Sequence, residues 1–349
     1  MHSTSRMGVS RAVFLGLLLG LWPPSTAGRA AAQDAGRVNL YRFILGVDVP
    51  ASPAFVPLGV GPQVLRGSAP KPLEASAFAG AGAASYGVAV SAAPYFLAGG
   101  GQQTLADYRA STVTGRLLRV LTKTIVSVGA ARAADDPDDL VVGLAVRSTF
   151  HDPHDPVLKS SLAEDVAAAL REAGVPPLDP AEEDVTRHGV DLAPLFARAR
   201  RAMRGRVAGG DPQVSGGWGM AGRLRDGAWD RDRLGTLHHA FWLSAQVTLG
   251  RRFDVLATAQ LRDAFEDARY GLVGAALLRK TAVLDLVAEV AYDTDRRALY
   301  PGLALSGRVL PTVGLTAALT THTAPELARA GPRPIAVRVT AQWFYASDH

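Results

Sequence analysis

In the C-terminal third of the chain, apolar and polar side chains alternate with a period of two. The clearest example runs over residues 335–345, where the apolar or aromatic positions are Ile335, Val337, Val339, Ala341, Trp343 and Tyr345. The residues between them include Arg338, Thr340 and Gln342. Successive side chains of a strand point to opposite faces, so this pattern predicts a strand with one apolar face and one largely polar face.

The same alternation recurs in earlier segments. It is found at residues 86–96, 140–150, 214–225, 237–249, 253–262, 282–293 and 312–320, and a less regular strand is predicted at about 119–132. Counting back from the C-terminus gives about 11 segments, whereas single-chain bacterial barrels have an even number of strands. We therefore expect about 12 strands, with the missing one at 40–47 or within 98–120.

Amphipathic strands build either soluble β-sandwiches or membrane barrels, and two features favour the barrel. Aromatic residues are expected on the outward face near strand ends, as at a membrane interface: Trp218, Phe241, Tyr292, Trp343 and Tyr345. The opposite face repeatedly carries charged residues, which would line the lumen: Arg147, Arg223, Arg225, Asp254, Arg262, Asp285, Glu289, Asp293, Arg308 and Arg338. The sequence therefore predicts an all-β fold, an antiparallel transmembrane β-barrel spanning residues 83–346.

On these strands and the aromatic-rich last segment, the chain resembles the bacterial outer-membrane β-barrel class, with no particular subfamily indicated. The resemblance implies an outer-membrane location in a Gram-negative-type cell. It also implies the lipid bilayer and the outer-membrane assembly machinery as partners.

The N-terminal region has the pattern of an export signal followed by an irregular lead. Arg6 and Arg11 precede the apolar run 12–22, and small residues follow up to Ala32, so residues 1–32 are expected to be a cleaved signal peptide. Residues 33–82 are rich in Pro and Gly, which disfavour helices and central strands. Two interpretations remain open for this lead: a flexible linker, or a plug in the lumen held by apolar residues such as Phe55, Val56 and Leu58.

Residues 156–205 interrupt the strand pattern and predict a two-helix insert. Leu158, Leu162, Val166 and Leu170 recur at helical spacing, and a strongly basic helix is expected over 191–204. This basic helix is a candidate docking surface for a protein partner.

Charge and cysteine content narrow the function further. The formal net charge of +5 falls to +2 once the three arginines of the predicted signal are removed, and no basic stripe with aromatic partners is present, so nucleic acid is not an expected ligand. The chain has no cysteine, which excludes disulfides and thiolate sites.

Candidate chemistry is sparse. The cluster of residues 151–155 (His-Asp-Pro-His-Asp) could hold a divalent ion, but the pattern favours a Pro-containing turn between a strand and a helix. The acidic loop 135–139 lacks the spacing of a calcium-binding loop. Residues 238–239 (His-His) lack a recognisable nucleophile motif nearby. We therefore expect no enzymatic activity, no cofactor and no bound metal.

Two functions follow from the inward charges. In an open lumen they would set selectivity, which predicts a passive, porin-like channel for small solutes or ions. In a narrow lumen they would pair with one another and close it, which predicts a non-conducting barrel that acts as an anchor or assembly component.

Overall fold

The computed structural model describes a closed antiparallel barrel and the segments attached to it. The described residues are 52–58, 73–81, 84–97, 108–133, 138–153, 155, 158, 212–224, 237–249, 253–262, 270–280, 284–294, 297–310, 313–320 and 336–344. The strands are β1 (Leu73–Ala81), β2 (Ala84–Ala92), β3 (Ile125–Ala133), β4 (Leu140–His151), β5 (Gln213–Leu224), β6 (His238–Leu249), β7 (Phe253–Arg262), β8 (Tyr270–Lys280), β9 (Leu284–Asp293), β10 (Ala298–Leu310), β11 (Val313–Thr320) and β12 (Ala336–Phe344). Three short helices accompany them: η1 (Pro53–Phe55), α4 (Pro94–Leu97) and α6 (Val113–Thr122).

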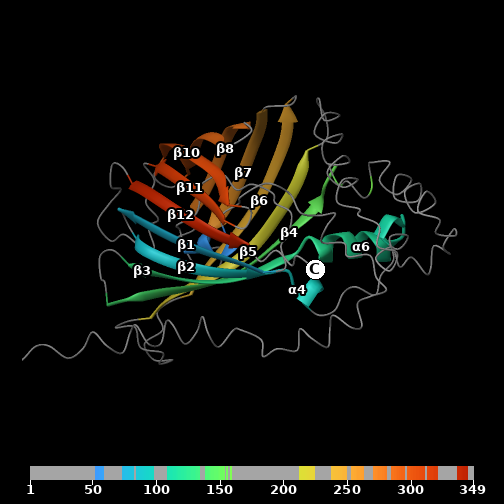
Figure 1. Cartoon of the computed structure of the whole chain (residues 1–349), viewed down its shortest axis with the longest axis horizontal. Helices are drawn as coiled ribbons and strands as arrows, with labels where there is room; N and C mark the ends of the chain where they lie inside the picture. Colours follow the sequence, from blue (N-terminus) through green and yellow to red (C-terminus); the bar gives the residue numbers. More distant parts are fainter. Residues whose placement is uncertain are drawn as a thin grey trace, which may run out of the picture.

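Each strand pairs with its neighbour in sequence, and β1 pairs with β12 to close the ring (Figure 1). Closure leaves no unpaired sheet edge, as a strand-built membrane protein requires. The outward positions are apolar and exposed, and β7 shows this in a strict exposed–buried alternation from Phe253 to Arg262. The predicted fold class, a transmembrane β-barrel of about 12 strands, is confirmed. Among the helices of the described part, none is long and apolar enough to span a bilayer.

The strand connections differ between the two ends of the barrel. At one end, called here the short-turn end, connections of two or three residues join β6 to β7, β8 to β9 and β10 to β11. β4 ends and β5 begins at this end, and α6 extends away from the barrel there (Figure 1). The opposite, long-loop end carries the longer connections between β5 and β6 and between β11 and β12.

The first strand lies where the sequence predicted an irregular lead. β1 falls within residues 33–82, so the barrel begins before the predicted boundary at residue 83 and the twelfth strand is not in 98–120. The alternation of β1 is weak because, after Leu73, its outward side chains are the small Ala75, Ala77 and Ala79, while Phe78 faces inward. The other proposed location, 40–47, lies outside the described residues.

The strand predicted at 119–132 is also partly wrong. The helix α6 continues to Thr122, and β3 starts only at Ile125. Thr112 caps the helix by accepting a hydrogen bond from the Gly115 backbone N–H at 3.1 Å. The predicted helices of the insert 156–205 fall outside the part of the chain that the structure describes.

Candidate functional site in the barrel interior

The inner wall of the barrel is formed by every second side chain of each strand. On β6 these include Trp242, Ser244 and Gln246, which lie opposite Gln260, Thr258 and Leu256 of β7. Asp254, two residues before Leu256, also faces inward and is diagonal to Gln246. Ser244 and Thr258 share a hydrogen bond of 3.1 Å between their hydroxyls, and the Gln246 Nε2 donates to Asp254 Oδ2 at 2.7 Å. This sector of the wall is polar, hydrogen-bonded and buried.

A second polar cluster spans the seam at which the barrel closes. Gln342 Nε2 of β12 donates to Glu74 Oε1 of β1 at 3.1 Å, and Ser76 Oγ donates to the same oxygen at 3.2 Å. The three side chains are buried. The Glu74 carboxylate thus joins the first and last strands from inside the lumen.

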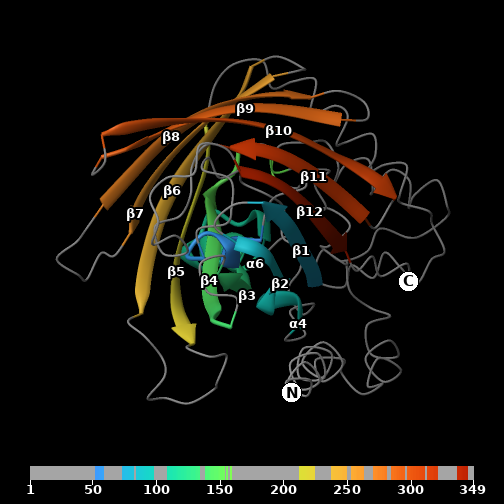
Figure 2. The ribbon, with the colours of Figure 1, turned by 90° about the vertical axis from the view of Figure 1, so that its left-hand side faces the viewer.

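The segment 52–58 lies inside the barrel against the inner faces of β2, β3 and β4. Figure 2 shows it within the ring of strands, next to β4. Phe55 packs edge-on against Phe78 with ring centroids 5.2 Å apart, and Leu58 is fully buried. Ser52 shares a hydrogen bond of 2.8 Å with Ser91 of β2. The segment therefore occupies one side of the lumen, which is the position of a plug.

Glycines of the inner wall make room for this segment. A Cβ at Gly129 would lie 3.1 Å from Ala54 Cβ, and one at Gly143 would lie 3.1 Å from Leu58 Cγ. At Gly219 the corresponding distance to Pro57 Cγ is 2.8 Å. Larger side chains at these positions would collide with the segment, so the wall is shaped to receive it.

Solvent exposure divides the inner wall into two sectors. Along the middle of β1 to β8 the inward side chains are almost all buried. Along β9 to β12 the inward positions that are only partly buried include Asp285, Val287, Glu289, Ala304, Thr316, Ala318 and Thr340. The β1 to β8 side is called here the filled sector. Within it the segment 52–58 packs against β1 to β6, and Leu256, Ala276 and Leu278 pack together at β7 and β8. The opposite sector is accessible to water at its partly buried positions.

The predicted lumen residues are distributed over both sectors. Arg147, Asp254 and Arg262 are buried at inward positions of the filled sector, whereas Asp285, Glu289 and Asp293 lie at inward positions of β9. Arg223 forms an ion pair with Asp139 near the long-loop end. Asp139 is the last residue of the acidic loop 135–139, so one carboxylate of that loop is paired with an arginine. Arg308 and Arg338 are described only by backbone register, opposite Gly314 and Gly80 respectively, and Arg225 lies outside the described residues.

The predicted interface aromatics occupy the outer face, but not all lie near strand ends. Trp343 and Tyr292 lie close to the ends of β12 and β9 and are exposed. Trp218 lies in the middle of β5, opposite Phe241 of β6, and stacks on His239 with centroids 6.0 Å apart. Tyr345 falls outside the described residues.

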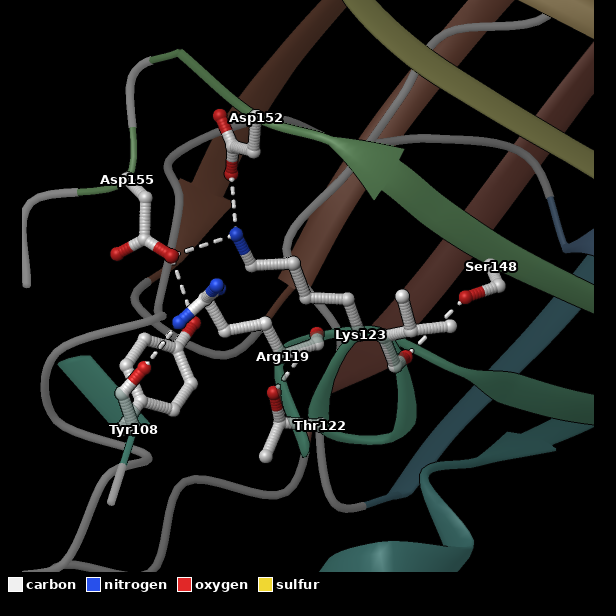
Figure 3. A network of polar contacts seen from close by, with 8 residues as sticks. Tyr108, Arg119, Thr122, Lys123, Ser148, Asp152 and Asp155 are labelled. Carbon is white, nitrogen blue, oxygen red and sulfur yellow. Dashed lines mark hydrogen bonds and ion pairs between the residues drawn. The ribbon is translucent and has the colours of Figure 1, made fainter. Parts of the chain in front are cut away.

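A charged network that sequence reasoning missed fixes α6 to the short-turn end (Figure 3). The Lys123 ammonium donates to Asp155 Oδ2 at 2.6 Å and to Asp152 Oδ2 at 2.9 Å, and Tyr108 Oη donates to Asp155 Oδ2 at 2.6 Å. Arg119 donates to the Tyr108 carbonyl. Lys123 and Asp155 are almost fully buried. The two acids of the candidate metal cluster 151–155 therefore bind an ammonium group.

Burial and the neighbouring carboxylates of Asp152 and Asp155 shift the pKa values of Tyr108 and Lys123. Burial, reinforced by the Asp155 carboxylate, raises the pKa of Tyr108 above its ordinary value. Burial alone would lower the pKa of Lys123, but the carboxylates of Asp155 and Asp152 outweigh it and raise that pKa. In the part of the chain that the structure covers, no three His, Cys, Asp or Glu side chains group as metal ligands would.

These shifts predict a loss of stability at alkaline pH. Because both folded-state pKa values are raised, the network contributes its full stability below about pH 10 and loses it as the pH rises further. The guanidinium unfolding midpoint of the refolded barrel, measured between about pH 8 and pH 11.5, should therefore fall at the alkaline end. In a Tyr108→Phe/Lys123→Met variant, the unfolding midpoint should fall less steeply with pH. An equally steep fall in both proteins would show that Tyr108 and Lys123 do not cause the alkaline loss of stability.

The solved structures that this chain resembles are distant from it in sequence and in structure. Neither protein-family models nor curated protein sequences match this chain. Solved structures that resemble it include the KdgM porin, with 5% identity and a TM-score of 0.39 over 78% of this chain and 99% of that chain. The beta domain of the Bordetella autotransporter BrkA has 10% identity and a TM-score of 0.34 over 78% of this chain and 98% of that chain. The translocator domain of the autotransporter NalP from Neisseria meningitidis has 9% identity and a TM-score of 0.31 over 78% of this chain and 88% of that chain.

Proposed function

We propose that this protein is a passive channel of the bacterial outer membrane, through which small polar solutes or ions diffuse. The observation that carries the proposal is the accessible sector of the inner wall. Inward side chains that include Asp285, Glu289 and Thr316 are partly exposed although they lie inside a closed ring of strands, whereas Asp293, Tyr300, Ser306 and Gln342 of the same strands are buried. Water that reaches these side chains provides a path alongside the segment 52–58.

An outer-membrane location fits the apolar exterior and the export signal expected at residues 1–32. Diffusion along a polar wall requires no catalytic group, so the proposed function is non-enzymatic. The alternative role as an anchor or assembly component depends on a partner at the basic helix 191–204. Those residues lie outside the described part, and this role stays a prediction of the sequence.

Planar-bilayer conductance tests the channel directly. Folding is first established by heat-modifiable gel migration of the detergent-solubilised protein. The folded barrel should then produce discrete conductance steps in a planar bilayer. Folded protein that inserts without any such steps would refute the channel.

The acids of the accessible sector are expected to raise the permeability to cations. Asp285 and Glu289 lie on the same face of β9 and are only partly buried, whereas the inward Arg147 and Arg262 are buried. Carboxylates that reach the aqueous path favour cations. An Asp285→Asn/Glu289→Gln variant should lower the cation-to-anion permeability ratio obtained from reversal potentials in a salt gradient.

A matched control uses Asp254, which is fully buried in the filled sector. Asp254→Asn should leave the permeability ratio close to that of the unmodified protein. Equal ratios for the β9 variant and the unmodified protein would show that the solute path lies elsewhere.

A further inference from the structure

The outer face of β4 to β7 carries an open groove of about 820 Å³. Its lining residues include Phe150, Gly216, Trp218, Phe241, Leu243 and Leu261. Apart from the glycine these are large apolar side chains, and Phe150, Leu243 and Leu261 are exposed. The groove therefore belongs to the surface that contacts hydrocarbon.

Gly216 lies within the groove, between rows of larger outward side chains. Gly216 pairs with Ser148 on one side and with Leu243 on the other. In the adjacent row, Trp218 pairs with Val146 and with Phe241. Phe150 and Leu243 lie over Gly216, where an added Cβ would be 3.0 Å from Phe150 Cε2 and 3.4 Å from Leu243 Cδ1. The groove therefore runs between the large side chains that flank this glycine.

Two hydroxyl groups line the groove where it meets the segment that follows α6. Thr124 Oγ1 lies 2.8 Å from the Val120 carbonyl oxygen and 3.0 Å from Ser148 Oγ, and Ser148 Oγ lies 3.1 Å from that carbonyl oxygen, so the two hydroxyls and the carbonyl form one hydrogen-bonded group. Thr124 directly precedes β3, so these hydroxyls lie at the short-turn end. The groove thus has a polar margin near the expected membrane–water boundary, and the rest of its lining is predominantly apolar.

We propose that this groove is a binding site for one acyl chain of a phospholipid from the leaflet at the short-turn end. A site on the lipid-facing surface is in contact with acyl chains throughout, and its volume lies within the range of about 300–1,000 Å³ that is typical of specific ligand sites. An acyl chain enclosed by Trp218, Phe241 and Leu243 gains more dispersion contacts than it would on a smooth outer wall. The polar margin at Thr124 and Ser148 places the headgroup end of the lipid at the short-turn end. This site is independent of the proposed channel.

Fluorescence quenching of Trp218 by a brominated phospholipid tests the site. In the full chain, Trp22, Trp229, Trp242 and Trp343 are replaced by Phe to leave Trp218 alone, and a second variant keeps only Trp343. Trp343 is exposed on the outer face but does not line the groove. In detergent micelles with a low mole fraction of brominated phospholipid, Trp218 should be quenched several-fold more than Trp343.

A pair of alanines on β7 supplies matched controls. Ala259 lines the groove, whereas Ala257 lies two residues away on the same outer face and does not. Ala259→Phe should reduce the quenching of Trp218 to the level of Trp343, and Ala257→Phe should leave it unchanged. Equal quenching of Trp218 and Trp343, or no effect of Ala259→Phe, would overturn the proposal. A change of oligomeric state caused by Ala259→Phe would also overturn it and would assign the groove to a second copy of this chain.

Discussion

Replacing Phe55, Val56 and Leu58 with serine is expected to raise the single-channel conductance several-fold. These side chains are buried inside the barrel, where they pack against inward residues such as Phe78 and Trp242. Burial of each contributes about 1.5–3 kcal/mol, so three serines remove most of the attraction that holds the segment in the lumen. With the segment released, the lumen next to β2, β3 and β4 would fill with water. Current steps from the triple variant and the unmodified protein are compared in the same bilayer and salt.

An independent variant displaces the segment without altering it. The three atoms nearest to a Cβ at Gly143 all belong to the segment: Leu58 Cγ and Cδ2 and the Ala54 carbonyl oxygen, at 3.1–3.3 Å. Gly143→Val should therefore push the segment away from β4 and raise the conductance in the same direction. Unchanged conductance in both variants, with normal heat-modifiable migration, would show that residues 52–58 do not restrict the path.

The alternation of side chains was enough to predict most of the barrel. In β7 and β12, outward Val255 and Val339 alternate with inward Gln260 and Gln342, because hydrocarbon and lumen impose opposite polarity on neighbouring residues. The same rule placed Asp254 and Arg262 on the inner face. The period of two therefore fixes both the element and the face, which is why these assignments could be made without coordinates.

The alternation was less informative where small residues or local apolar runs replace it. β1 carries alanines outward and was predicted to be irregular. The run at 117–121 contains four apolar residues in five and fits a helix or a strand, and α6 was therefore partly read as a strand. β1 is fixed by its pairing with β2 and β12, and the start of α6 is fixed by the Thr112 cap. Neither feature produces a periodic pattern in the local sequence.

The interior site depends on contacts between residues far apart in sequence. Phe55 and Leu58 could be named as lumen anchors, but only as one of two interpretations, since a Pro-rich segment carries no period that shows where it packs. The glycines that receive the segment lie on β3, β4 and β5, more than 70 residues further along the chain. Lys123 and Asp155 are 32 residues apart, and no spacing rule links them. Such pairs become predictable only once the strand order is known.

Asp155→Asn is expected to destabilise the barrel by about 3 kcal/mol. The change leaves the buried Lys123 ammonium with one carboxylate, and removing a partner from a buried ion pair costs about 3–5 kcal/mol. The lower end of that range applies because Asp152 still accepts from Lys123 at 2.9 Å. The loss of unfolding free energy is measured by guanidinium unfolding of the refolded protein. It should lower the unfolding midpoint and leave the dependence of the free energy on denaturant concentration unchanged.

Two further variants test whether the loss arises from the uncompensated charge. Asp152 is more exposed than Asp155, with 16% against 1% of its side chain accessible, so Asp152→Asn should cost clearly less. Lys123→Met/Asp155→Asn removes both charges and should be more stable than the sum of the two single losses predicts. Additive losses would mean that the two groups act separately. In that case, the Lys123–Asp155 ion pair would not be what fixes α6 to the end of β4.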